Sequence, residues 1–229
     1  MKKLAIFVEG QTEQIFVAKL LTEIAGKKNI VIENQTKIKE LIFVTIGLTT
    51  NVEDPKYYVL IRDCKGDTSV KSAILDVCER FANKKYEKIL GLRDVHPLSV
   101  SDIPKLLIGL KFGIPQNLLP IHILLAIMEI EAWFLAETSH FSKIDSSLSI
   151  DIIKENLGFD PVNEDVESRQ NPAQDLHEIY QLVGKFYNKK KKYVQRTVNA
   201  LDYGEIYLNL KKKIGSLDKF IEQIDLFLD

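Results

Sequence analysis

The chain has 229 residues, of which 45% are hydrophobic and 28% are charged, so collagen-like, low-complexity and wholly disordered proteins are excluded. Its 31 basic and 32 acidic side chains give a formal charge of -1, so binding to nucleic acid or to a membrane would need a local patch. The two cysteines, Cys64 and Cys78, are too few for a disulfide framework or a four-cysteine zinc site and favour a reducing, cytoplasmic compartment.

The first elements predicted along the chain form a strand–turn–helix unit. Residues 4–8 are a continuous apolar run, as in strands that are buried on both faces. Thr12 is predicted to cap a helix over residues 12–24, with Glu13 in its first turn. Glu9 is therefore expected at the carboxyl end of a buried strand.

Further strands alternate with helices in the next part of the chain. Strands are predicted at residues 30–32, 41–46, 57–61, 89–92 and 121–128, and helices at residues 70–81 and 102–111. Thr68 is a predicted cap for the first of these helices. This alternation predicts an α/β fold with a mostly parallel, Rossmann-like sheet flanked by helices. The long apolar stretch at residues 121–136 carries Glu129 and Glu131, which argues against a membrane span.

The pattern changes to a helical one after residue 138. Helices are predicted at residues 151–157, 173–186, 193–201 and 217–228. We therefore expect residues 1–137 to form the α/β domain and residues 138–229 to form a helical C-terminal extension packed on it.

Acidic side chains follow several of the predicted strands. Glu9, Asp63 and Asp94 each end a strand, and Glu129 and Glu131 follow a fourth. Because functional groups gather at the carboxyl ends of the strands in an open α/β sheet, we expect these acids at one edge. Clustered carboxylates repel one another unless a cation lies between them, and hard oxygen ligands suit Mg²⁺ or Mn²⁺. The alternative for any single acid is helix capping or exposure to solvent.

Two segments of the chain resemble a known family. Residues 6–13, Ile-Phe-Val-Glu-Gly-Gln-Thr-Glu, resemble the opening motif of Toprim domains, which occur in topoisomerases, bacterial primases, recombination mediators and nucleases of the OLD family. The Glu-Gly-x-Thr-Glu form is especially similar to the OLD-like and related uncharacterised bacterial branches, and residues 129–136 resemble a motif in one of these. The resemblance covers residues 1 to about 136 and implies a Toprim-like fold.

The resemblance also implies roles for individual residues. Glu9 matches the acid after the first strand, which is a metal ligand or general acid/base in the family, and Asp94 matches the first acid of a later Asp-x-Asp motif, as a metal ligand. His96 stands where the second Asp is expected. His96 could replace that Asp as a ligand or a base, Glu129 and Glu131 could supply the missing carboxylates, or the site could be degenerate and inactive.

Asp63 and Glu13 are weaker candidates for the same site. Asp63 is a possible further metal ligand, because it ends a predicted strand. Glu13 lies one helical turn beyond the Glu-Gly motif and could face the site, or it could simply be an acid in the first turn of a helix.

One segment of this neutral protein is strongly basic. Residues 185–196 contain six basic side chains, three aromatic side chains and no acid. Lysines with interleaved aromatic rings suit contacts with phosphates and stacking on bases. The alternative is a solvated helix end. The candidate nucleic-acid-binding residues are Lys189, Lys190, Lys191, Lys192 and Arg196.

Together these features predict an Mg²⁺- or Mn²⁺-dependent nuclease that cleaves phosphodiester bonds in nucleic acid, with DNA as the expected substrate. The resemblance suggests a setting in phage defence or DNA repair. The alternative is a non-catalytic Toprim-like module that binds a partner protein, such as a separately encoded ATPase. No membrane partner is expected, and the expected location is the cytoplasm.

Overall fold

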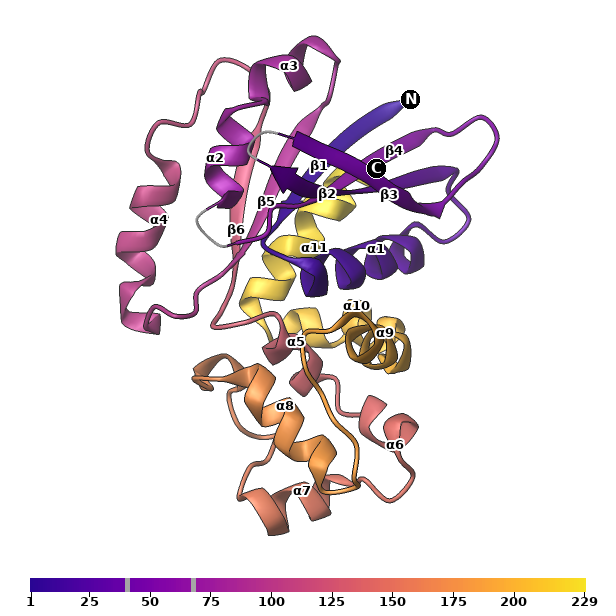
Figure 1. Cartoon of the computed structure of the whole chain (residues 1–229), viewed down its shortest axis with the longest axis vertical. Coiled ribbons are helices and arrows are strands. Elements are labelled where there is room, and N and C mark those ends of the chain that lie inside the picture. Colours follow the sequence, from indigo (N-terminus) through magenta and orange to yellow (C-terminus); the bar gives the residue numbers. More distant parts are fainter. Residues whose placement is uncertain (40–41, 67–68) are drawn as a thin grey trace. The chain divides into compact units, whose positions relative to one another are not determined.

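The computed structural model describes residues 1–39, 42–66 and 69–229, and it has an α/β fold. Its six-stranded sheet has the strand order β3-β2-β4-β1-β5-β6 (Figure 1). The strands are β1 (Lys2–Val8), β2 (Ile30–Lys39), β3 (Ile42–Thr50), β4 (Tyr57–Asp63), β5 (Lys88–Asp94) and β6 (Ile121–Ala126). The predicted cap Thr68 and Leu41, the first residue of a predicted strand, lie outside the described residues.

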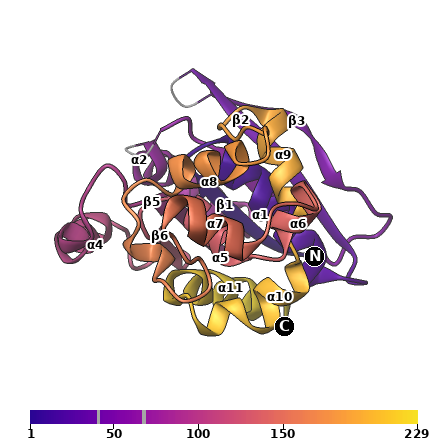
Figure 2. The same cartoon turned by 90° about the horizontal axis from the view of Figure 1, so that it is seen from below.

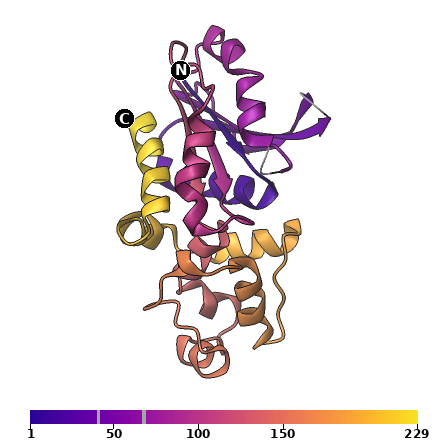
Figure 3. The ribbon, with the colours of Figure 1, turned by 90° about the vertical axis from the view of Figure 1, so that its left-hand side faces the viewer.

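The sheet is mostly parallel, as the alternation of elements predicts. The central strand β1 pairs in parallel with β4 and β5, and β2 pairs in parallel with β4. Strand β3 pairs antiparallel with β2 and forms a ribbon with it at the edge of the sheet (Figure 3). Residues 4–8 of β1 are fully buried, which agrees with the reading of that apolar run as a strand covered on both faces.

The prediction of one helix over residues 70–81 is wrong, because the segment forms two helices, α2 (Ser69–Leu75) and α3 (Cys78–Asn83). The helix is interrupted at Val77, whose φ of -125° is outside the helical range. Val77 is nevertheless buried in the same apolar cluster as Phe7 and Phe81. The apolar spacing therefore continues across the break, and periodicity alone could not reveal it.

Two further predicted elements differ in length from those observed. The strand predicted at residues 30–32 continues to Lys39, and its second half is half-buried or exposed where it pairs with the edge strand β3. The helix predicted at residues 173–186 ends at Gln181 as α8 (Pro172–Gln181). Gly184 follows with a φ of +67°, a left-handed conformation that favours glycine and does not continue a helix.

The chain divides into two compact units. The first contains Met1–Arg93, Ser101–Leu125 and Glu222–Asp229, and the second contains Asp94–Val100 and Ala126–Ile221. The domain boundary predicted after residue 137 stays a prediction. In the first unit, α2 and α3 cover the sheet face that carries Phe7 and Leu60. The first unit also contains α1 (Gln11–Ala25), α4 (Ile103–Lys111) and the last part of α11 (Gly215–Leu228).

The second unit is helical apart from its connecting segments. Within it α5 (Glu131–Ala136) packs against α8, α8 packs against α7 (Ile150–Leu157), and α6 (His140–Ile144) packs against α9 (Lys191–Ala200) (Figure 2). It also contains α10 (Tyr203–Leu208) and the first part of α11. Short 3-10 turns lie at Val100–Asp102, Val166–Ser168 and Leu210–Lys212. Over the described residues, none of these helices combines the length and the apolar character needed to cross a bilayer.

Candidate metal centre

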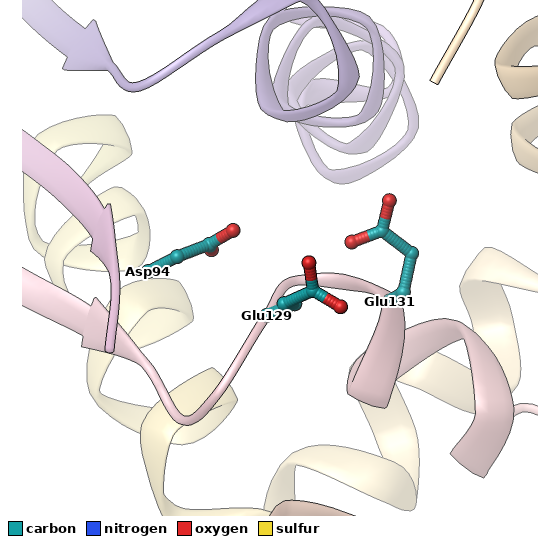
Figure 4. Close-up of side chains that lie close together, drawn as sticks. All are labelled: Asp94, Glu129 and Glu131. Carbon is teal, nitrogen blue, oxygen red and sulfur yellow. The ribbon is translucent and has the colours of Figure 1, made fainter. Parts of the chain in front are cut away.

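Three carboxylates converge in the second unit. Asp94 ends β5, Glu129 lies in the loop after β6, and Glu131 is the first residue of α5. One oxygen from each lies within 4.8 Å of the others, and the three side chains point toward one another (Figure 4). All three residues are buried, and Glu131 is fully so.

Backbone hydrogen bonds bring these acids together. The amide of Val95 donates to the carbonyl of Ala126 at 3.1 Å, and the amide of His96 donates to the carbonyl of Met128 at 2.8 Å. Met128 has a φ of +59°, in the left-handed region that costs a non-glycine residue about 1 kcal/mol. The chain turns there, and the amide of Ile130 donates to Oδ1 of Asp94 at 3.2 Å.

Glu129 joins the cluster to helix α8. The backbone amide of Ala173, in the first turn of α8, donates to Oε2 of Glu129 at 2.9 Å. The partial positive charge at that helix end favours a carboxylate there. The ammonium of Lys189 donates to the other oxygen, Oε1, also at 2.9 Å.

Glu131 is held by the segment between α8 and α9. The hydroxyl of Tyr187 donates to Oε1 of Glu131 at 2.8 Å, and Nζ of Lys189 lies 3.7 Å from Oε2. Burial lowers the pKa of Lys189, but the carboxylates of Glu131, Asp94 and Glu129 act in the opposite direction, and the pKa is raised overall. Lys189 is therefore an ammonium held by the acidic cluster.

One acid of the cluster, Glu129, borders a cavity of about 450 Å³. Glu129 and Lys189 both line this cavity, together with Tyr187 and His177. The carbonyl of Tyr187 lies 2.8 Å from Nδ1 of His177, so the ring is fixed to the same segment. A small anionic group entering the cavity would meet the ammonium of Lys189 on its wall.

The donor set fits a hard divalent cation. All three side chains offer carboxylate oxygens, which Mg²⁺ and Mn²⁺ prefer over nitrogen and sulfur. Two oxygens on opposite sides of one Mg²⁺ lie about 4.2 Å apart. The carboxylate oxygens of the cluster lie within 4.8 Å of one another, so small shifts would let them bind one ion. Lys189 already places one positive charge against two of the three acids. The surroundings of these carboxylates thus favour a cation.

The other predicted site residues of the second unit have separate surroundings. His96 is half-buried, and among the described residues the ligand geometry groups Asp94 with Glu129 and Glu131 but not with His96. The guanidinium of Arg196 donates to the carbonyl of Phe186 and lies over the ring of Tyr180 at 5.3 Å. Arg196 therefore helps to fix the segment that carries Lys189.

The three lysines after Lys189 are exposed. Lys190 precedes α9, and Lys191 and Lys192 lie in its first turn, where no acidic residue is present. The ammonium of Lys192 lies 4.6 Å from the ring centroid of Tyr193. Positive charges at this end oppose the helix dipole, so the first turn of α9 is a favourable place for an anion.

Glu9, Glu13 and Asp63 belong to the first unit. Glu13 is buried, and its Oε2 accepts the amide hydrogen of Gly10 at 2.8 Å, so it stabilises the start of α1. Asp63 accepts hydrogen bonds from the Thr36 hydroxyl at 3.1 Å and the Lys65 amide at 2.9 Å. Glu9 is half-buried, and its carbonyl accepts from the amide of Gly66. Their roles as ligands stay predictions.

Two residues of the site were not predicted in these roles. Tyr187 has no local motif, and Lys189 was predicted only as one member of a basic run. Each contacts an acid that lies at least 56 positions earlier in the chain. The start of α9 at Lys191 separates Lys189 from Lys191 and Lys192, but Lys190 also precedes the helix, so no local signal singles out Lys189.

No protein-family model, no curated protein and no solved structure matches this chain. The fold and the chemistry of the site are therefore the basis for assigning a function.

Proposed function

We propose that this protein is an Mg²⁺- or Mn²⁺-dependent phosphodiesterase that cleaves nucleic acid. The observation that carries the proposal is the convergence of Asp94, Glu129 and Glu131 within 4.8 Å beside a cavity of about 450 Å³. When bound there, a divalent cation would polarise a phosphoryl oxygen, activate water and stabilise the leaving oxygen.

The side chains around the cluster have distinct tasks in this proposal. Asp94, Glu129 and Glu131 hold the cation through their oxygens. Tyr187 orients Glu131 through its hydroxyl hydrogen bond, as outer partners of metal ligands commonly do. Lys189 lies on the cavity wall, where its ammonium can bind a phosphate oxygen. Glu9 is added as a further ligand on the Toprim resemblance alone.

Nucleic acid, with DNA first, is the proposed substrate class because of the basic residues near the site. Lys190, Lys191 and Lys192 are exposed around the start of α9. Exposed ammonium groups at a helix N-terminus suit phosphate contacts that are independent of base sequence. Phage defence or DNA repair is the setting that the resemblance favours, with an ATPase as a possible partner protein.

The test is cleavage of labelled single-stranded DNA, double-stranded DNA and RNA by the full chain with Mn²⁺, Mg²⁺ or a chelator. We expect metal-dependent cleavage that Asp94→Asn reduces by about 100-fold or more, because a lost ligand removes several kcal/mol of transition-state stabilisation. Glu155→Gln, which neutralises an exposed acid on α7, is the matched control and should leave cleavage unchanged. Cleavage that survives Asp94→Asn would overturn the proposed site.

The contribution of the exposed lysines is measured separately by the salt dependence of binding. Replacing Lys190, Lys191 and Lys192 by Gln should lower the log–log salt slope by about 0.9 for each phosphate contact that is lost on duplex DNA. Cleavage at saturating substrate should persist, because these contacts are common to the ground state and the transition state. An unchanged slope would show that the lysines form only a solvated helix end.

The second candidate function is a non-catalytic module that binds a partner protein. One observation favours it: each of the three carboxylates already accepts a hydrogen bond within the unit, from Ile130, Ala173 or Tyr187. A purely structural network would look like this. If the chain binds no Mn²⁺ and cleaves none of the three nucleic acids, the module is the better account.

A further inference from the structure

Lys189 is the cation that the chain itself supplies to the acidic cluster. Its Nζ lies 2.9 Å from Oε1 of Glu129 and 3.7 Å from Oε2 of Glu131. The two carboxylates are buried, whereas the lysine side chain is 46% exposed and lies along the cavity wall. Lys189 and Glu129 thus line the same cavity, and the ammonium reaches Glu129 along the cavity wall.

A divalent cation would compete with this ammonium for carboxylate oxygens of the cluster. Oε1 of Glu129 and Oε2 of Glu131 are the atoms that face Lys189, while the other oxygens of both acids accept from Ala173 and Tyr187. A cation on the two lysine-facing oxygens would also repel an ammonium at these distances. A cation bound there would therefore push the ammonium away.

The lysine can leave while the rest of the site stays in place. Its anchor points are separate from its charge: the Tyr187 hydroxyl is bonded to Glu131, and the Lys190 amide is bonded to Asn188 at 3.0 Å. Only the flexible four-carbon stem of Lys189 has to move. Once it is released from the acids, its ammonium remains beside the cavity.

We propose that Lys189 is the internal counter-ion of the Asp94–Glu129–Glu131 cluster, and that a divalent cation enters the site by displacing its ammonium. This inference rests on the proposed function, because it assumes that the cluster is a metal site. It adds a regulation of that site: Lys189 stabilises the metal-free protein, weakens the affinity for metal, and becomes available to a phosphate only when the metal is bound.

The experiment compares the wild-type chain with Lys189→Met, which keeps the stem and removes the charge. The matched control is Lys190→Met, which removes the charge of the exposed neighbour, and Lys189→Arg is the charge-preserving variant. Two quantities are measured for each: the melting temperature in chelator, and the affinity for Mn²⁺ by calorimetry. Lys189→Gln replaces Lys189→Met if that variant does not fold, because its amide can still donate to Glu129.

We expect Lys189→Met to melt several degrees lower than the wild type without metal, and to bind Mn²⁺ about tenfold more tightly, since repulsion from a nearby unit charge is removed. Lys190→Met should leave the affinity for Mn²⁺ unchanged and should not lower the melting temperature, because a positive charge at the start of α9 opposes the helix dipole. Lys189→Arg should stay near the wild type. If the wild type binds Mn²⁺ and Lys189→Met binds it equally well or more weakly, the counter-ion role of Lys189 is overturned, but the metal site stands.

The remaining outcomes separate this inference from the proposed function. If only Lys189→Met binds Mn²⁺, Lys189 is a counter-ion that the metal does not displace. The displacement and the metal-dependent function of the native chain then fail, and only the counter-ion role stands. If no variant binds Mn²⁺ at high millimolar concentration, the cluster is not a metal site, and both proposals fail.

Discussion

Helix α5 has a buried glutamate at each end, and the two have opposite surroundings. Glu131 begins the helix beside two further carboxylates and the ammonium of Lys189. Glu137 caps the other end, and neutral donors satisfy it: Ser139 donates through its amide at 3.0 Å and its hydroxyl at 2.5 Å, and the Asp202 amide donates at 3.0 Å. Both side chains are fully buried.

The difference shows that burial of an acid does not by itself mark a functional site. The cavity near Glu137 has a volume of about 610 Å³ and is larger than the cavity of about 450 Å³ near Glu129. Size alone would therefore select the Glu137 end. At that end neutral hydrogen-bond donors already stabilise the single carboxylate, whereas the Glu131 end gathers like charges that a cation would stabilise.

The largest difference between the two ends is expected in metal dependence. Mn²⁺ at about 100 times its dissociation constant should stabilise the wild-type chain by about 2.7 kcal/mol, because it binds only the folded state. Glu131→Gln should lose this gain, and should also lose about 100-fold or more of any cleavage activity. Glu137→Gln should keep the gain in full. Calorimetric unfolding of both variants with and without Mn²⁺ measures this stabilisation. If both variants lost the same amount of it, the two ends of α5 would not differ in metal binding.

The Glu137 end should also respond to acid through His140. This ring is fully buried, with Nδ1 bonded to the carbonyl of Glu137, and burial lowers its pKa from 6.5 to about 4. Between these two values the unfolded chain binds more protons, so stability falls as the pH falls from 6.5 to 4. The loss attributable to His140 is about 3 kcal/mol at most. His140→Asn should flatten this part of the pH profile of unfolding, and an unchanged profile would contradict the assignment.

Replacing Glu137 should cost stability whether or not metal is present. In Glu137→Gln an amide hydrogen would face one of the donors from Ser139 or Asp202, so at least one buried hydrogen bond is lost, at a cost of about 2 kcal/mol. Chemical denaturation in chelator and in Mn²⁺ should give the same loss. A loss that Mn²⁺ reverses would instead place the Glu137 end within the metal centre.

The smallest effect is expected for Tyr187→Phe at the Glu131 end. The change removes only the hydroxyl that donates to Glu131 Oε1 and should lower the stability of the metal-free chain by about 1 kcal/mol. Because the hydroxyl orients a ligand, the affinity for Mn²⁺ should fall by about tenfold as well. Tyr193→Phe, which removes the hydroxyl of a half-buried tyrosine on α9, is the control, and equal affinities in the two variants would exclude an orienting role.

The sequence predicts much of the sheet and the acids of the cluster, because both follow from local patterns. Continuous apolar runs identify β1, β4 and β5, and Asp94 and Glu129 are found because an acid after a buried strand is expected at the edge of a sheet. The polar half of β2 carries no such pattern, since its residues pair with an exposed edge strand.

Tertiary contacts decide what the local patterns cannot. Glu13 and Glu131 look alike in the sequence, as acids in the first turn of a helix after a strand. Glu13 accepts from the amide of Gly10 three positions away, while Glu131 contacts Tyr187 and Lys189 in the segment between α8 and α9. Such long-range partners leave no spacing signal, and so the role of Lys189 emerged only from the folded chain.

Crystals grown or soaked with Mn²⁺ test most directly whether Asp94, Glu129 and Glu131 together bind a divalent cation. Anomalous diffraction at the manganese edge should give one peak in contact with oxygens of all three acids, with the ammonium of Lys189 moved away from Glu129. Diffraction that shows no manganese at this cluster, with Lys189 still bonded to Glu129 at high Mn²⁺ concentration, would contradict such binding.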